Sequence, residues 1–556
     1  MGTAQVTAAD RRRVRAGRIA GAATLIAGLT VLSRVAGFGR TMVFAWAVGD
    51  NDLGDIYQAA NIIPNIVFEI VAGGALASLV VPMLAGAIAA GDRAEVGRIT
   101  SALLCWVLTL LAPLALGLVL AAEPMMAALL TDPTPAQVAG AAAMLRIFAP
   151  QVPLYGVGIV LTGVLQAHRR FAWPVLAPLL SSITVSSAYV GLVAVDGRGV
   201  AVAELSGAGM WTLAGGTTVG VVVLAGCLVP VVARLRLRLR PTWRFDAATR
   251  SRVGQLATAG AITVGAQHVA LAVAVWRGNA GPEGTWVLFT LAQAIFLLPW
   301  AVFAVPLATA AYPGLAEAAA VGNETDYRHT LARTTRMVLL LSWLGAAALV
   351  AVARPAASLL AVLMPAGGVD SVDRLAAGIA GFAPGLVGYG LFAVLSRALY
   401  ARGRTRAVSV AALLGWGTAA VAMLGLSPAL PDDHRVLALT GAHSLGMLVL
   451  GVLLWWATAR AAGPAAVAGG IRVTLVGLMA ATVAAVAGWW VAGWLLPFGH
   501  PPTFGAAIGS GMLAGVTVLT GFGVLAWVTD RRDVQPALVA LGRRLRRRAA
   551  TGASGD

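Results

Sequence analysis

Stretches of about twenty apolar residues, separated by short polar connections, recur along the whole chain. That is the length an α-helix needs to cross the hydrocarbon core of a bilayer. The composition agrees, since 59% of the 556 residues are hydrophobic and only 11% are charged. We predict an all-α polytopic membrane protein. This excludes a soluble enzyme or a nucleic-acid-binding protein.

Fourteen apolar runs are delimited by Gly, Pro and charged residues. The first follows a basic stretch, as in a signal peptide, but it is long and carries Arg34 and Arg40, so we expect no cleavage. The expected crossings begin near Ile19, Ile56, Thr100, Val138, Pro174, Trp211, Val253, Thr285, Leu331, Leu375, Ala407, Val436, Val473 and Phe504.

Charge predicts the orientation, because Arg and Lys near membrane ends stay cytoplasmic. With the N-terminus inside, 31 Arg lie on the cytoplasmic side and five outside, whereas acidic residues number ten inside and twelve outside. A missed crossing would move every later loop to the other side. We therefore expect an even number of crossings and cytoplasmic N- and C-termini.

The net charge of +17 indicates anionic membrane lipids as partners, because no basic stretch lies in a soluble domain that would bind nucleic acid. The tail after Arg531 has leucines at helical spacing among arginines, typical of a helix on an anionic leaflet, although a solvated tail fits equally. The Arg-Leu alternation from Arg234 to Arg240 has no assigned chemistry. Cys105 and Cys227 lie in apolar runs and indicate neither a disulfide framework nor a metal site.

The chain contains an internal duplication. The pattern from Phe148 to Arg170 recurs 234 residues later, and the pattern from Pro82 to Gly91 recurs 231 residues later. The offset spans six crossings, so both halves should have the same orientation about an axis along the membrane normal. The expected parts are a basic N-terminus (1–18), an N-lobe of helices 1–6 (19–233), a basic linker (234–252), a C-lobe of helices 7–12 (253–460), helices 13–14 (461–529) and a basic tail (530–556).

Two six-helix lobes create an interface at mid-membrane, where transporters of this design bind their substrate; the alternative is a scaffold with no passage. Charges inside a bilayer are costly and therefore informative. Arg34 lies near mid-bilayer and Arg40 follows six residues later, about 120° around an ideal helix. Gly37 and Gly39 between them permit a bend that would turn both toward one cavity.

The second crossing carries a matching polar stripe of Gln58, Asn61, Asn65 and Glu69, with Pro64 as a point of flexure. One interpretation is a hydrophilic pocket in which Arg binds a phosphate-bearing ligand; the other is an internal ion pair between Arg34 and Glu69. Asp55 either caps its own helix or acts as a gate. The remaining polar or charged candidates are Arg146 and Arg397, interpreted as structural, and Gln255, Gln267, His268 and Gln293 in the second half.

The run Leu32-Ser33-Arg34-Val35-Ala36-Gly37-Phe38-Gly39-Arg40 resembles the opening of the lipid II flippases, also called MurJ or MviN. The resemblance continues in Asp55, Ile63-Pro64-Asn65, Gly74-Ala75-Leu76 and Val81-Pro82, and then in Leu145-Arg146, Gly163-Val164-Leu165-Gln166-Ala167 and Ser396-Arg397-Ala398-Leu399-Tyr400-Ala401-Arg402-Gly403. It implies the multidrug/oligosaccharidyl-lipid/polysaccharide exporter fold with an alternating-access cavity. The implied activity is transport of undecaprenyl-diphosphate-linked peptidoglycan precursor from the inner to the outer leaflet.

The resemblance implies that Arg34, Arg40 and Asp55 are needed for function. Some relatives carry a basic residue at the position of Phe68, an acidic one at Gly73 and a basic one near Ala294, and some have a sodium site whose carboxylate we do not find here. These departures leave the coupling ion open, with the membrane potential as one candidate driver and no cofactor expected.

We therefore expect a non-enzymatic transporter of the bacterial cytoplasmic membrane that binds lipid II. One alternative is an exporter of another polyprenyl-linked glycan or a drug; the other is a non-transporting scaffold for cell-wall or division proteins. The candidate substrate-binding residues are Arg34, Arg40, Asn61, Asn65 and Glu69, and the candidate gating residues are Asp55, Pro64, Gly73 and Gly74.

Overall fold

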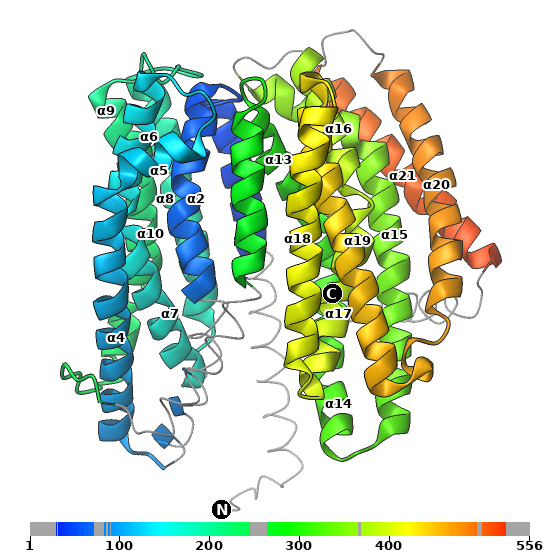
Figure 1. Cartoon of the computed structure of the whole chain (residues 1–556), viewed down its shortest axis with the longest axis horizontal. Coiled ribbons are helices and arrows are strands. Elements are labelled where there is room, and N and C mark those ends of the chain that lie inside the picture. Colours follow the sequence, from blue (N-terminus) through cyan, green and yellow to red (C-terminus); the bar gives the residue numbers. More distant parts are fainter. Residues whose placement is uncertain are drawn as a thin grey trace, which may run out of the picture. The chain divides into compact units, whose positions relative to one another are not determined.

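The computed structural model describes residues 29, 32–71, 80, 83–84, 87–88, 90–168, 170–244, 264–364, 369–496 and 503–529. Every regular element in these ranges is a helix, which confirms the predicted all-α class (Figure 1). The chain divides into two compact units. Unit 1 comprises residues 1–48, 56–128 and 133–261, and unit 2 comprises residues 49–55, 129–132 and 262–556.

Unit 1 is built on long helices joined by short turns. Its core joins α4 to α7 and α7 to α10 around Leu103, Val107, Val160 and Leu161. Its helices are residues 32–47, most of α2 (Asp52–Val71), α4 (Arg93–Leu120), α5 (Ala122–Leu129), α6 (Pro135–Phe148), α7 (Gln151–Ala167), α8 (Ala172–Val195), α9 (Gly207–Met210), the π-helical η2 (Trp211–Gly215), α10 (Gly216–Gly226) and α11 (Val229–Ala233).

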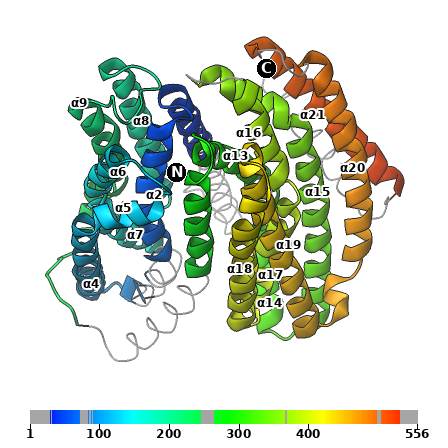
Figure 2. The same cartoon turned by 45° about the horizontal axis from the view of Figure 1, so that its top comes forward.

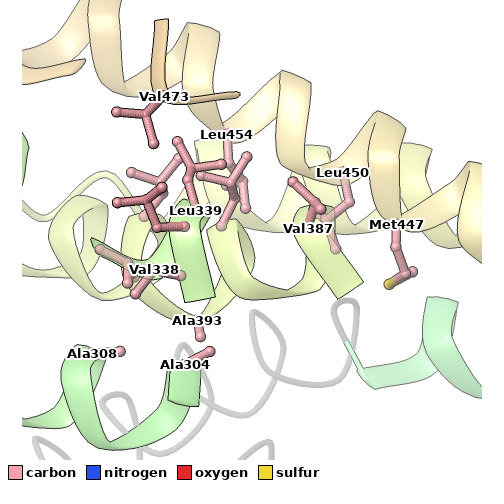
Figure 3. Close-up of a cluster of buried hydrophobic side chains, with 14 of the residues drawn as sticks. Ala304, Ala308, Val338, Leu339, Val387, Ala393, Met447, Leu450, Leu454 and Val473 are labelled. Carbon is pink, nitrogen blue, oxygen red and sulfur yellow. The ribbon is translucent and has the colours of Figure 1, made fainter. Parts of the chain in front are cut away.

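Unit 2 is a larger bundle in which α15 packs against α20 and α21, and α19 packs against α17 and α18 (Figure 2). Its core is largely aliphatic and includes Val338 and Leu339 of α15 and Leu450 and Leu454 of α19 (Figure 3). Its helices are residues 264–279, α13 (Thr285–Pro299), the π-helical η3 (Trp300–Ala304), α14 (Val305–Ala320), α15 (Glu324–Leu363), α16 (Val369–Phe382), α17 (Gly385–Ala401), α18 (Thr405–Ala429), η4 (Asp432–His434), α19 (Arg435–Ala462), η5 (Pro464–Val467), α20 (Gly470–Leu495) and α21 (Phe504–Thr529).

The helix boundaries repeat with the offsets of the sequence duplication. α6 and α7 begin and end 234 residues before α16 and α17, and α4 begins 231 residues before α15. The helix starts are also alike, because Asp92 caps α4 and Asn323 caps α15, each accepting the backbone N–H three residues later. The two halves therefore share local structure as well as sequence.

Ten helices among the described residues have the length and composition to cross a membrane, or eleven if the bent pair α16 and α17 forms one span. The pair bends by 41° at Ala383-Pro384, because Pro384 has no N–H for the helical ladder. The predicted starts at Thr285 and Phe504 match helix starts, and those at Ala407, Val436 and Val473 fall within three residues. The predicted starts at Ile19 and Val253 lie outside the described residues.

Candidate functional site

The helix at residues 32–47 carries both arginines that the sequence selects. Arg34 is exposed within unit 1 and Arg40 is half-buried. The helix runs unbroken through Gly37 and Gly39. Among the described atoms, none lies within 4 Å of a Cβ built on either glycine. Within the part of the chain that the structure describes, no side chain therefore packs directly on these two glycines.

A buried aromatic cluster that no sequence pattern predicted lies next to Arg40. The Tyr57 hydroxyl lies 2.9 Å from the Tyr189 hydroxyl and 2.8 Å from the Thr217 hydroxyl. Phe44, one turn after Arg40, stacks on Tyr57 with ring centroids 5.3 Å apart. The Arg40 charge acts electrostatically on both tyrosines. These contacts hold the helix of Arg40 against α2, α8 and α10.

The predicted polar stripe of α2 is engaged inside unit 1. Tyr155 of α7 donates its hydroxyl to Asn65 Oδ1 at 3.0 Å, and Asn65 Nδ2 donates to the Asn61 carbonyl at 2.9 Å. Asn61 Oδ1 is buried and accepts no hydrogen bond from the described residues. Pro64 is buried beside them and Glu69 is exposed. The side-chain oxygen of Asn65 thus accepts a hydrogen bond from Tyr155, whereas the side-chain oxygen of Asn61 has no donor among the described residues.

Asp55 caps another helix rather than its own. Its Oδ2 accepts the Gly284 N–H at 2.8 Å and its Oδ1 accepts the Val287 N–H at 2.9 Å, so the carboxylate closes the N-terminus of α13. The start of α2 is capped by Asn51, whose Oδ1 accepts the Gly54 N–H at 3.0 Å. The interpretation of Asp55 as a cap of its own helix is therefore wrong.

Neighbouring polar groups hold the turn that presents these N–H groups to Asp55. Arg374 of α16 donates to the Thr285 hydroxyl at 2.8 Å and to the Glu283 carbonyl at 3.1 Å. Ser371, one turn earlier, donates to Asp50 Oδ2 at 2.5 Å. We call the carboxylate of Asp55 with residues 284–287 the α13 latch. Arg374 acts on the latch by positioning its turn.

Gly284 is the most constrained residue of the α13 latch. Its φ is +76°, and a Cβ there would collide with the Asp50 carbonyl. We expect Gly284→Ala to lower the unfolding temperature of the purified protein, because left-handed strain of about 1–2 kcal/mol combines with overpacking of about 1–3 kcal/mol. Gly322→Ala is the matched control, because Gly322 has φ +69° and open space around it. Equal shifts in both variants would contradict this account.

Several sequence candidates contribute no described contact to this region. Gly73, Gly74 and Gln255 lie outside the described residues, as does the side chain of Phe68. Ala294, Gln267 and Gln293 are half-buried, and buried His268 contacts the Val264 carbonyl of its own helix through Nδ1. Arg397 likewise donates to the Ala393 carbonyl of its own helix at 2.6 Å, and Arg146 lies 3.8 Å from Glu123.

Cys105 and Cys227 are both free. Among the residues that the structure describes, no three His, Cys, Asp or Glu side chains gather closely enough to hold a metal ion.

The sequence profile of the family described as "Lipid II flippase MurJ" matches residues 44–500 of this chain. The chain belongs to the MurJ family. This confirms the resemblance drawn from the sequence motifs, and the family is one of transporters rather than enzymes. The matched region begins after Arg40, so the likeness of Arg34 and Arg40 to the family rests on the motif from Leu32 to Arg40.

Curated MurJ relatives are distant in sequence. The chain is 27% identical to a probable lipid II flippase MurJ of Rhizobium meliloti, over 59% of this chain and 61% of the relative. It is 27% identical to the lipid II flippase MurJ of Burkholderia cenocepacia, over 68% of this chain and 72% of the relative. The first of these alignments spans less than two thirds of the relative's length.

Solved structures show the same fold. A lipid II flippase MurJ in an inward closed conformation superposes with a TM-score of 0.70 at 15% identity, covering 90% of this chain and 99% of that one. An inward-facing multidrug resistance MATE transporter of the MOP superfamily superposes with a TM-score of 0.59 at 14% identity, covering 83% and 94%. The exporter fold that the resemblance implies is therefore confirmed.

Proposed function

We propose that the chain flips lipid II from the cytoplasmic to the outer leaflet of the bacterial inner membrane. The observation that carries this proposal is membership of the MurJ family over residues 44–500. The duplicated helix boundaries and the superposition on the exporter fold support an alternating-access cycle of two pseudo-symmetric lobes. The proposed topology has fourteen crossings and both termini in the cytoplasm. It is supported by the distribution of Arg, because it places 31 Arg on the cytoplasmic side, where basic residues near membrane ends are retained.

The substrate site would be organised by the guanidinium groups of Arg34 and Arg40. Guanidinium binds diphosphate oxygens through paired hydrogen bonds, and none of the described residues packs on Gly37 or Gly39 between the two arginines. The Asn61 acceptor would bind a donor group of the same headgroup, while Asn65 and Pro64 keep α2 in position. Glu69, exposed on the same helix, would contact the polar part of the lipid.

Asp55 would act as the gate through the α13 latch. The carboxylate satisfies two N–H groups of α13 in this state, and a change of state that moves α2 along α13 must break both hydrogen bonds. The membrane potential would drive such a cycle, because moving one elementary charge through 100 mV is worth about 2.3 kcal/mol. No step requires a cofactor.

Complementation tests the activity directly. Expressed in a bacterial strain depleted of its own lipid II flippase, the chain should restore growth and prevent accumulation of the lipid-linked precursor in the inner leaflet. Expression in the membrane without rescue, with precursor still accumulating, would contradict the proposal. That outcome would favour a sister exporter of another polyprenyl-linked glycan or a drug, which the superposition on a MATE transporter also fits.

A further inference from the structure

The segment after α11 packs along α4 in an extended conformation. Arg236 has φ +53° and turns the chain back, after which residues 236–244 contain no helix or strand. We call these residues the basic strap. Its backbone contacts α4 at two points. The Arg238 carbonyl lies against Gly97, and the Arg240 N–H donates to the Ser101 hydroxyl at 3.0 Å. The strap therefore has a defined course.

Two tryptophans hold the end of the basic strap. Trp106 of α4 donates its indole N–H to the Trp243 carbonyl at 3.0 Å, and Trp243 donates its own to the Thr109 hydroxyl at 2.9 Å. Their side chains remain 38% and 52% exposed. Partly exposed indoles with satisfied N–H groups are typical of the membrane interface. α4 is a candidate membrane span, and the strap lies along its N-terminal half, from Gly97 to Thr109.

Alternation separates two faces at the start of the strap. Leu237, like Leu235 just before the strap, packs on the core of unit 1, whereas Arg236, Arg238 and Arg240 are exposed. Leu239 is exposed as well. An extended chain rises about 3.3 Å per residue, so alternate side chains recur on one side about every 6.6 Å. In the part of the chain that the structure describes, no carboxylate forms an ion pair with these three arginines. The result is a row of cations held beside interfacial tryptophans.

We infer that the basic strap is a binding site for the phosphate headgroups of anionic phospholipids in the cytoplasmic leaflet. Guanidinium binds phosphate oxygens in bidentate fashion, and the backbone contacts to α4 order the row before a lipid arrives. Charge complementarity and the flanking indoles favour bilayer lipid over a soluble anion. This site is separate from the proposed transport site and does not depend on the transported substrate.

The test is native mass spectrometry of the detergent-solubilised full chain titrated with dioleoyl phosphatidylglycerol or dioleoyl phosphatidylcholine. The triple variant Arg236→Gln, Arg238→Gln, Arg240→Gln should weaken phosphatidylglycerol binding at least tenfold, since each arginine near an anionic surface contributes about fivefold. Phosphatidylcholine binding should stay unchanged. The corresponding triple Lys variant should stay within about threefold of wild type, which shows that the loss comes from charge.

The matched control is Arg333→Gln, Arg404→Gln, Arg406→Gln, which removes the same charge from exposed positions of unit 2. It should retain phosphatidylglycerol binding within about twofold. Equal losses in both Gln variants would overturn the inference, because binding would then follow net charge alone. Unchanged binding in the strap variant, or an equal loss of phosphatidylcholine, would also overturn it.

Discussion

Replacing Arg40 or Arg34 by Ala should abolish rescue of a flippase-depleted strain. A guanidinium that binds diphosphate makes charge-assisted hydrogen bonds of about 1.5–3 kcal/mol each, so losing a bidentate pair should lower lipid II transport on the order of a hundredfold or more. The measurement is precursor export by cells in which the variant is present in the membrane at wild-type level. Arg40→Lys should rescue partly, because Lys keeps the charge but lacks the fork geometry.

Arg146→Ala is the control for these two substitutions. Arg146 also lies within a predicted crossing, but it is exposed beside Glu123 and has no place in the proposed site. It should rescue fully. Unaltered export in the Arg34 and Arg40 variants would refute the site. Rescue by the double variant would favour the alternative of a non-transporting scaffold for cell-wall or division proteins.

Replacing Asp55 by Ala should impair both transport and stability. The change leaves two backbone N–H groups of α13 without their acceptors, and loss of a helix cap costs about 0.5–2 kcal/mol. A less stable latch should shift the resting population of states, and we expect transport to fall at least tenfold. The measurements are precursor export, the unfolding temperature, and labelling of cysteines introduced near the N-terminus of α13.

Asp52→Asn is the matched control for Asp55. It removes an acidic charge from the same first turn of α2, and the Asp52 carboxylate accepts the N–H of its neighbour Leu53. Transport and labelling should stay close to wild type. An Asp55→Ala variant with normal export and unchanged labelling would contradict the gate even if its unfolding temperature fell.

Hydrophobic runs predicted the start of a helix well where the helix is apolar from its first turn. The predicted start at Phe504 matches the start of α21, because a long uninterrupted apolar stretch has no other way to satisfy its backbone in a bilayer. The prediction was less accurate at Leu375, where α16 begins at Val369. The polar residues Asp370, Asp373 and Arg374 mask that helical turn in a search for apolar residues.

Sequence patterns selected candidate site residues but not the contacts that the structure shows for them. Charges within apolar runs selected Arg34 and Arg40, and spacing along one helix face selected Asn61 and Asn65. The tyrosine cluster around Tyr57 was missed, although buried Tyr hydroxyls in an apolar helix require hydrogen-bond partners and would have been a usable signal.

The amino-acid sequence by itself determined the helical membrane fold, the duplication and the family of this chain. Hydrophobic periodicity, charge bias and internal repeats can be recognised in the amino-acid sequence alone, because they depend on neighbouring residues or on counts along the chain. The tertiary structure alone decided that Asp55 caps α13, that Tyr155 engages Asn65 and that the basic strap lies on α4. Each of these contacts joins residues far apart in the chain, and only packing of the helices determines which donor meets which acceptor.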